Sequence, residues 1–287
     1  LTLVPDEPYP NETGAGALSS SVLYGFESWG DIFTPRLGLA LTTFIKYIDE
    51  ACNMMVGDDG LRLATRTCLA QSLNRLADFS SSLCRLNSTG GRGVVNTFSR
   101  QALPMMWNFL ETNPFNDVGA NWAGSVDTYV ATIEAETANI IGGHAERASA
   151  TNHILPDGAA AAFVTDPPYY DAIAYGDLSD FFYVWLRRTL ADHYPSLLRE
   201  SLVDKTDEVV HLSKRFRGPY SHKTASYFEN GMQMAMREGR RVLASNGIGV
   251  VVFAHKSTSG WEAMLSALID SGWKVTGSWP VDTERGG

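Results

Sequence analysis

AAAAFVTDPPYY, residues 159–170, is the stretch that decides the fold class of this chain. Residues 159–165 form a short apolar run that leads directly into the tetrapeptide DPPY at 166–169. A continuous apolar run of this length, without polar alternation, is typical of a strand buried on both faces of a parallel sheet. We therefore expect a buried strand whose carboxyl end delivers the tetrapeptide.

Helical and strand patterns alternate downstream of this strand. The expected elements are helices over 178–198, 222–244 and 259–270 and strands over 248–254 and 274–281. Strands and helices alternating at this spacing predict an α/β sheet with right-handed crossovers. Such sheets bind ligands beyond the carboxyl ends of their strands, which is where the tetrapeptide is expected.

The N-terminal half is mainly helical by pattern. Thr34 offers an N-cap hydroxyl, Pro35 suits the first helical position, and apolar residues follow at helical spacing. Further helices are expected over 59–86, 99–110 and 125–141. The predicted domain organisation is a linker or loop over 1–22, a helical region over 23–143 and an α/β part over 144–287.

Composition limits the classes of protein that fit. The 287 residues carry a formal net charge of -9, so a role on nucleic acid requires a local basic surface. The cysteines Cys52, Cys68 and Cys84 form no C-x-x-C pair and have no suitably spaced histidine, so we expect packing thiols in a reducing cytoplasm and no metal site. No apolar run reaches the roughly 20 residues that span a bilayer, so we expect a cytoplasmic protein with no membrane partner.

The tetrapeptide suits the chemistry of a base amine. The amino nitrogen of adenine is a poor nucleophile because its lone pair is delocalised into the ring. Two acceptors that hold its N–H groups localise that pair, and they strengthen as positive charge develops. The Asp166 carboxylate and the Pro167 carbonyl are the candidate acceptors.

The remaining residues of the motif explain its spacing. Pro167 and Pro168 fix their φ angles and remove two backbone donors, which gives a stiff corner. Tyr169 offers a flat face on which an extruded base can stack, worth about 1–3 kcal/mol, and Tyr170 adds a second ring. The candidate catalytic residues are therefore Asp166, Pro167, Pro168 and Tyr169. The alternative is an ordinary strand-to-turn junction, because Asp and Pro both favour turns.

The sequence around the motif resembles closely the adenine-specific DNA methylases that carry a zinc ribbon. The central block is VTDPPYYDAIAY at 164–175 followed by LSDFFYVWLRR at 178–188. Shorter segments of the same kind are WGDIFTPR at 29–36, NTFSRQA at 96–102, MWNF at 106–109, NPF at 113–115, AHK at 254–256 and WP at 279–280. The resemblance covers most of the chain from about residue 22.

This resemblance implies a Rossmann-like fold that binds S-adenosylmethionine and methylates the exocyclic amine of adenine in DNA. The family's glycine-rich donor-binding strand and its zinc ribbon have no match here, so we interpret the chain as a piece of a longer protein with an incomplete fold. The remainder of that protein is expected to supply both features. As a result, we expect this chain to bind the methyl donor weakly.

Further residues are expected to contact the methyl donor. The candidate donor contacts are Phe33, Thr34, Ser149, Thr151 and Asp166. Backbone N–H groups at Phe33 and Thr34 suit the donor's carboxylate, with simple helix capping as the alternative, while Ser149 or Thr151 lies where related methylases place a polar residue near the donor's adenine. For Ser149 and Thr151 a plain strand end is the alternative.

Contacts to substrate and DNA are expected from Tyr170, Tyr175, Lys214, Arg215, Arg217, His255 and Lys256. The three cations at 214–217 belong to the one basic stretch of the chain, which suits phosphate contact or a solvated loop. His255 and Lys256 end the predicted strand at 248–254 and face the same rim as the motif. Two other functions stay open: methylation of an amine on an RNA base, and a non-catalytic DNA-binding scaffold.

Overall fold

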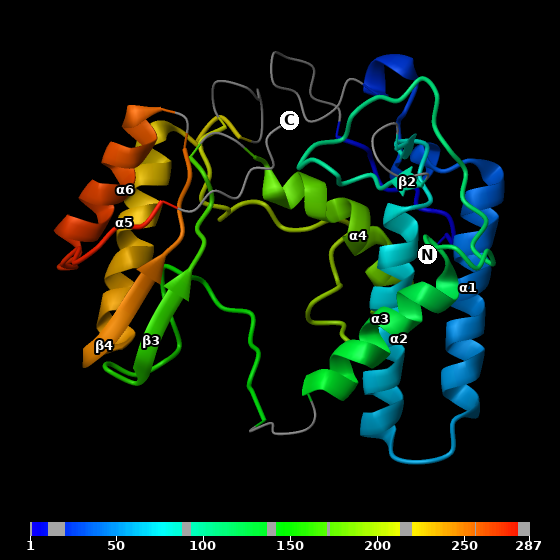
Figure 1. The fold of residues 1–287 in the computed structure, drawn as a ribbon, viewed down its shortest axis with the longest axis horizontal. Helices are drawn as coiled ribbons and strands as arrows, with labels where there is room; N and C mark the ends of the chain where they lie inside the picture. The colour runs from blue at the N-terminus through cyan, green and yellow to red at the C-terminus, as the bar shows by residue number, and fades with distance from the viewer. Residues whose placement is uncertain are drawn as a thin grey trace. The chain divides into compact units, whose positions relative to one another are not determined.

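The computed structural model describes residues 2–10, 21–87, 93–136, 142–170, 173–212, 220–255 and 257–280 (Figure 1). The chain divides into two compact units. Unit 1 comprises Leu1–Gly142 and Ala174–Glu208, and unit 2 comprises Gly143–Ile173 and Val209–Gly287. The chain therefore leaves unit 1, forms the first part of unit 2, and returns to unit 1 before completing unit 2.

Unit 1 is mainly helical. Its elements are η1 (Ser21–Tyr24), η2 (Trp29–Ile32), α1 (Pro35–Met54), α2 (Asp59–Asp78), β1 (Arg85–Leu86), β2 (Val94–Val95), α3 (Trp122–Glu136) and α4 (Tyr175–Leu190). Helix α2 packs against α1, α3 and α4 (Figure 1). The first helix begins as predicted, because the Thr34 hydroxyl accepts the Leu37 N–H at 3.4 Å and Pro35 occupies the first helical position.

The helix predicted over 99–110 is wrong. Residues 96–110 form turns and irregular backbone, and Leu103 is buried without belonging to a helix. Pro104 interrupts this segment, because it has no N–H to donate and it disfavours helical backbone at the preceding residue. The apolar spacing there reflects packing of a loop against unit 1.

The beginning of the chain is held to unit 1 by buried charge. Arg188 on α4 has a 1% exposed side chain and donates to Glu7 at 2.8 Å, and the Glu7 side chain is 4% exposed. Arg187 adds a second contact to Glu7 at 3.1 Å. Residues 2–10 are thus anchored, although their composition alone is that of a linker.

Unit 2 consists of a parallel strand pair and two helices. Its elements are β3 (Ala160–Thr165), α5 (Ala225–Val242), β4 (Leu243–Val251) and α6 (Thr258–Asp270). Strand β3 pairs with β4 in parallel, with Phe163 opposite Gly249 and Thr165 opposite Val251. The strands predicted at 159–165 and 248–254 and the three helices predicted between 178 and 270 are present, although β4 begins five residues earlier than predicted and α4 ends eight residues earlier, at Leu190.

Both helices of unit 2 cover the same face of the strand pair (Figure 1). Phe228, Met232 and Met236 of α5 pack with Met264 and Leu268 of α6, and Phe163, Val251 and Phe253 from the strand segments join this core.

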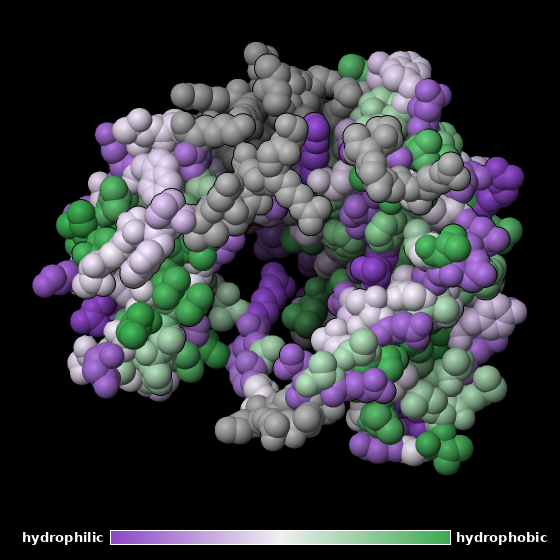
Figure 2. Space-filling view, viewed as in Figure 1, coloured by the Kyte–Doolittle hydropathy of each residue, from purple (hydrophilic) through white to green (hydrophobic). Residues whose placement is uncertain are grey.

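The opposite face of the strand pair is exposed and apolar. It carries Val164, Ile248, Val250 and Val252, with exposures of 71%, 69%, 46% and 50%, and Figure 2 shows hydrophobic residues gathered over β3 and β4. The expectation of a strand buried on both faces is therefore wrong for β3.

The complete Rossmann-like sheet is not present in the described residues. The third strand expected at 274–281 is absent, because residues 273–280 form no ladder. What the chain has is a mixed α and β architecture with one parallel pair among its described residues. In that same part of the chain, no helix combines the length and the apolar character needed to cross a membrane.

Candidate functional site

The tetrapeptide forms a corner directly after β3. Asp166 is exposed and Pro167 is buried, so the proline anchors the corner while the carboxylate faces outward. The Tyr169 hydroxyl donates to Asp166 Oδ1 at 2.6 Å. No described residue donates a hydrogen bond to the Pro167 carbonyl. The carboxylate of Asp166 is thus the exposed acceptor of this corner, and a role for the carbonyl of the buried Pro167 stays a prediction.

The backbone at Tyr170 is strained. Its φ of 46° lies in the left-handed region, which is uncommon for a residue with a bulky side chain. Such conformations persist where surrounding contacts impose them, and they gather at functional sites. Here the Tyr170 N–H donates to the Pro168 carbonyl at 3.2 Å, and the Tyr170 carbonyl accepts the His211 N–H at 3.0 Å.

Three aromatic rings pack against the Tyr170 side chain. His211, Phe228 and His255 lie edge-on to it, with ring centroids 5.2, 5.0 and 5.6 Å away. Tyr170 is half-buried by these rings. Its predicted role as a second stacking ring is untested, and its surroundings indicate that it also fixes the shape of the corner.

Two rings that the sequence did not single out extend the cluster. Phe253, which follows β4, lies edge-on to Tyr169 at 5.8 Å, and its ring is nearly parallel to that of His255 at 6.3 Å. Trp261 of α6 lies edge-on to Phe253 at 5.1 Å and keeps 42% of its surface exposed. Phe253 could have been found from its spacing, because it stands two residues before His255 on an extended segment and therefore faces the same side.

His255 is held by the start of α6. Its Nδ1 accepts the Ser257 N–H at 3.1 Å, and Ser257 caps the helix by accepting the Gly260 N–H at 3.3 Å. The expectation that His255 shares a rim with the motif agrees with its ring contact to Tyr170.

Ser149 and Thr151 lie in a tight turn ahead of β3. The two hydroxyls are 2.9 Å apart, and the Thr151 N–H donates to the Ser149 hydroxyl at 3.2 Å. No hydrogen bond joins this turn to Asp166 in the described part of the chain. A donor contact from this turn stays a prediction, and the local geometry is that of a self-satisfied turn.

Phe33, Thr34 and Tyr175 belong to unit 1. Phe33 is 7% exposed and its ring packs on Phe181 and Trp185, so it is part of the core. Thr34 caps α1 and also donates to the Glu111 carboxylate, which therefore lies at the helix terminus where we expected the donor's carboxylate. Tyr175 is the half-buried first residue of α4.

The predicted phosphate contacts Lys214, Arg215, Arg217 and Lys256 lie outside the described residues. Four other residues of the basic stretch are described: His222 is exposed, whereas Lys205, His211 and Lys223 are not solvated cations. Lys205 pairs with Asp180 at 2.8 Å, His211 is 5% exposed, and Lys223 is fully buried beside the ring of Tyr220. These three residues consequently do not form an exposed basic surface.

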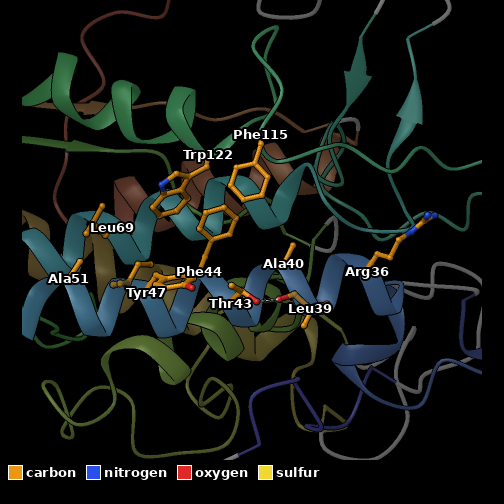
Figure 3. Close-up of a pocket in the computed structure, with 11 residues that line it drawn as sticks. Arg36, Leu39, Ala40, Thr43, Phe44, Tyr47, Ala51, Leu69, Phe115 and Trp122 are labelled. Carbon is orange, nitrogen blue, oxygen red and sulfur yellow. Dashed lines mark hydrogen bonds between the residues drawn. The ribbon is translucent and has the colours of Figure 1, made fainter.

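A cavity of about 690 Å³ lies in unit 1 between α1, α2 and α3 (Figure 3). Its walls are largely apolar, and Phe44 stacks on Trp122 with 4.5 Å between ring centroids. The Arg36 guanidinium at one end already pairs with Glu111 at 2.5 Å. This chemistry suits an apolar ligand and does not suit a methyl donor that carries a sulfonium, an amine and a carboxylate.

Comparisons of the chain with models of protein families, with curated proteins and with solved structures gave no match. The assignment of a function therefore depends on the residues of the corner and on their geometry.

Proposed function

We propose that this chain carries the base-binding part of an S-adenosylmethionine-dependent methyltransferase that acts on the exocyclic amine of adenine in DNA. The observation that carries the proposal is the exposed Asp166 carboxylate, held on a proline-locked corner at the carboxyl end of a parallel strand and flanked by aromatic rings. Ligands of α/β sheets bind at this edge. The sequence around the corner is also similar to that of adenine-specific DNA methylases with a zinc ribbon.

The role of the corner is to hold and activate the base. Asp166 accepts one N–H of the amine and the Pro167 carbonyl accepts the other. Two acceptors favour a tetrahedral nitrogen with a localised lone pair, and their attraction grows as the nitrogen gains positive charge. The ring of Tyr169 stacks on the base, and Tyr170, clamped by its neighbours, keeps the corner in place.

The described residues do not form a site that fits the methyl donor. S-adenosylmethionine supplies an electrophilic methyl group, and binding it requires a partner for its carboxylate. The helix terminus at Thr34 already holds Glu111, and the Ser149 turn satisfies its own hydroxyls. We therefore place the donor site on the remainder of a longer chain that carries the glycine-rich loop and the zinc ribbon.

The exposed apolar face of the strand pair supports the proposal that the chain is part of an incomplete Rossmann-like fold. Parallel sheets occur almost only with both faces covered, and two strands alone are marginally stable. Val164, Ile248 and Val250 leave an apolar face open beside β3 and β4. We propose that further strands and helices of the longer protein complete this sheet.

Mass spectrometry of nucleic acid treated with the full-length protein and isotope-labelled donor tests the proposed function. We expect labelled N6-methyladenine in DNA. Asp166→Asn keeps the side-chain shape but removes the charged acceptor, and it should lower the rate by about 10²–10³, the range found when one transition-state contact is lost. Asp270→Asn, an exposed change at the end of α6, is the matched control and should leave the rate unchanged.

Two other outcomes of the labelling experiment would change the proposed function. Label in RNA alone would exclude DNA as the substrate and favour an RNA base amine. Absence of label from both nucleic acids, with DNA still bound, would favour the non-catalytic scaffold.

A further inference from the structure

The hydroxyl of Tyr169 occupies the acceptor that the proposed function needs. It donates to Asp166 Oδ1 at 2.6 Å. This length is in the range of strong hydrogen bonds between a hydroxyl and a carboxylate. The bond joins the two residues of the corner with the clearest expected roles, one as acceptor for the amine and the other as stacking ring.

In its present orientation, the Tyr169 ring cannot both donate its hydroxyl to Asp166 and stack its face on a base. A phenol whose hydroxyl points at a carboxylate presents its edge to that oxygen, whereas stacking requires it to present its face. Phe253 supports the present direction from the side, with the two ring planes at 89°. A base that brings its amine to Asp166 Oδ1 therefore meets the edge of the ring before it meets a stacking surface.

The backbone next to the ring allows little adjustment. Tyr170 follows directly with a φ of 46°, its carbonyl accepts the His211 N–H, and three rings surround its side chain. Motion of the Tyr169 ring consequently comes from its own side-chain torsions. Bringing the face of the ring toward the corner therefore requires a rotation of the Tyr169 side chain, which breaks its bond to Asp166.

We infer that Tyr169 is a latch on the site: its hydroxyl closes Asp166 until a base amine replaces that hydrogen bond. The inference rests on the proposed function, because it takes Asp166 as the acceptor for the amine. It makes the latch selective. An exocyclic amine gives the carboxylate an N–H donor in place of the tyrosine hydroxyl, whereas a purine without an exocyclic group has only ring nitrogens as acceptors on that edge and leaves the tyrosine bond in place.

The test measures binding of the unmodified chain and its variants to two short single strands by fluorescence anisotropy, without methyl donor. Both strands are oligothymidine, one with a single central adenine and the other with unsubstituted purine at that place. Tyr169→Phe keeps the ring and removes the latch, so affinity for the adenine strand should rise by about three- to tenfold, where tenfold is equivalent to about 1.4 kcal/mol. Affinity for the purine strand should stay unchanged.

A double-mutant cycle separates the latch from a general effect on structure. In an Asp166→Ala background, which has no carboxylate to close, adding Tyr169→Phe should change neither affinity. An equal rise for both strands, or a rise that persists in the Asp166→Ala background, would overturn the latch.

The same measurements distinguish failure of the latch from failure of the proposed function. If Asp166→Ala weakens adenine binding while Tyr169→Phe leaves it unchanged or weaker, the latch is wrong and the corner still binds a base. If neither change affects the adenine strand, the corner is not a base site, and both proposals fail.

Discussion

Asp180 is a carboxyl group whose environment in unit 1 opposes its charge. Its side chain is 1% exposed, and burial raises its pKa to about 6, although Lys205 at 2.8 Å and the Val203 N–H at 2.8 Å favour the charged form. Because the folded pKa lies above the unfolded value of 3.8, protonation favours the folded state. The stability that this group contributes is fully present below about pH 4 and is lost as the pH rises to about 6.

Asp180→Asn should remove this pH dependence. The free energy of unfolding of the wild type, relative to that of the variant, should fall between pH 4 and 6 and stay level above, by an amount on the order of 3 kcal/mol. Urea denaturation across this range measures the difference. Asp127→Asn, an exposed change on α3, is the control. A difference that rises with pH would show that the pair with Lys205 outweighs burial.

At the residue scale, the sequence located the motif because its chemistry is local. Asp166 and its two prolines follow a recognisable strand, so an exposed acceptor at a strand end was predictable. Phe253 was missed although its spacing from His255 indicated it, and Trp261 was missed because its contact with Phe253 depends on how α6 packs. The burial of Arg188 against Glu7 was also missed, since only tertiary structure brings residues 181 positions apart together.

At the element scale, replacing either of two helical glycines with alanine should change the stability of the fold, in opposite directions. A methyl group on Gly239 of α5 would come within 2.6 Å of the Phe163 ring on β3, whereas one on Gly38 of α1 would meet no atom within 4 Å. Replacing a helical glycine with alanine gains up to about 1 kcal/mol from helix propensity. Overpacking typically costs about 1–3 kcal/mol.

Gly239→Ala should therefore lower the urea midpoint and Gly38→Ala should raise it. Phe163 has little room to move, because its ring also packs on Trp273 at 5.6 Å. Equilibrium unfolding monitored by circular dichroism compares both variants with the wild type. A stabilised Gly239→Ala variant would mean that the ring yields, and that the contact between α5 and β3 is loose.

The elements predicted incorrectly share a physical cause. The helix expected over 99–110 had apolar spacing, but Pro104 prevents continuous helical hydrogen bonding. The strand expected at 274–281 had strand-like composition, but a strand exists only where a neighbour completes its ladder. Where caps and spacing agree, as at Thr34 and Pro35 of α1, the prediction was confirmed.

At the scale of the whole molecule, the order of elements along the chain does not follow the order of the compact units. The run from Ala174 to Glu208 directly follows the motif yet belongs to unit 1. Helix α4 joins unit 1 because it is apolar on the face that meets α2 and because its arginines hold Glu7. Such long-range pairing is set by charge burial and aromatic packing, which periodicity in the sequence does not encode.

Binding of the methyl donor is also a property of the whole molecule. The carboxylate of Glu111 already serves the α1 terminus at Thr34, and no stretch of the sequence matches the glycine-rich donor-binding strand of the methylases that the chain resembles. This chain should therefore bind S-adenosylmethionine with a Kd above about 1 mM, which is weaker than about −4 kcal/mol. Isothermal titration measures it, and the longer protein proposed above, with its glycine-rich loop, should bind far more tightly. Micromolar binding to this chain alone would mean that its own residues form the donor site. The proposal that the donor site lies on the remainder of a longer protein would then be wrong.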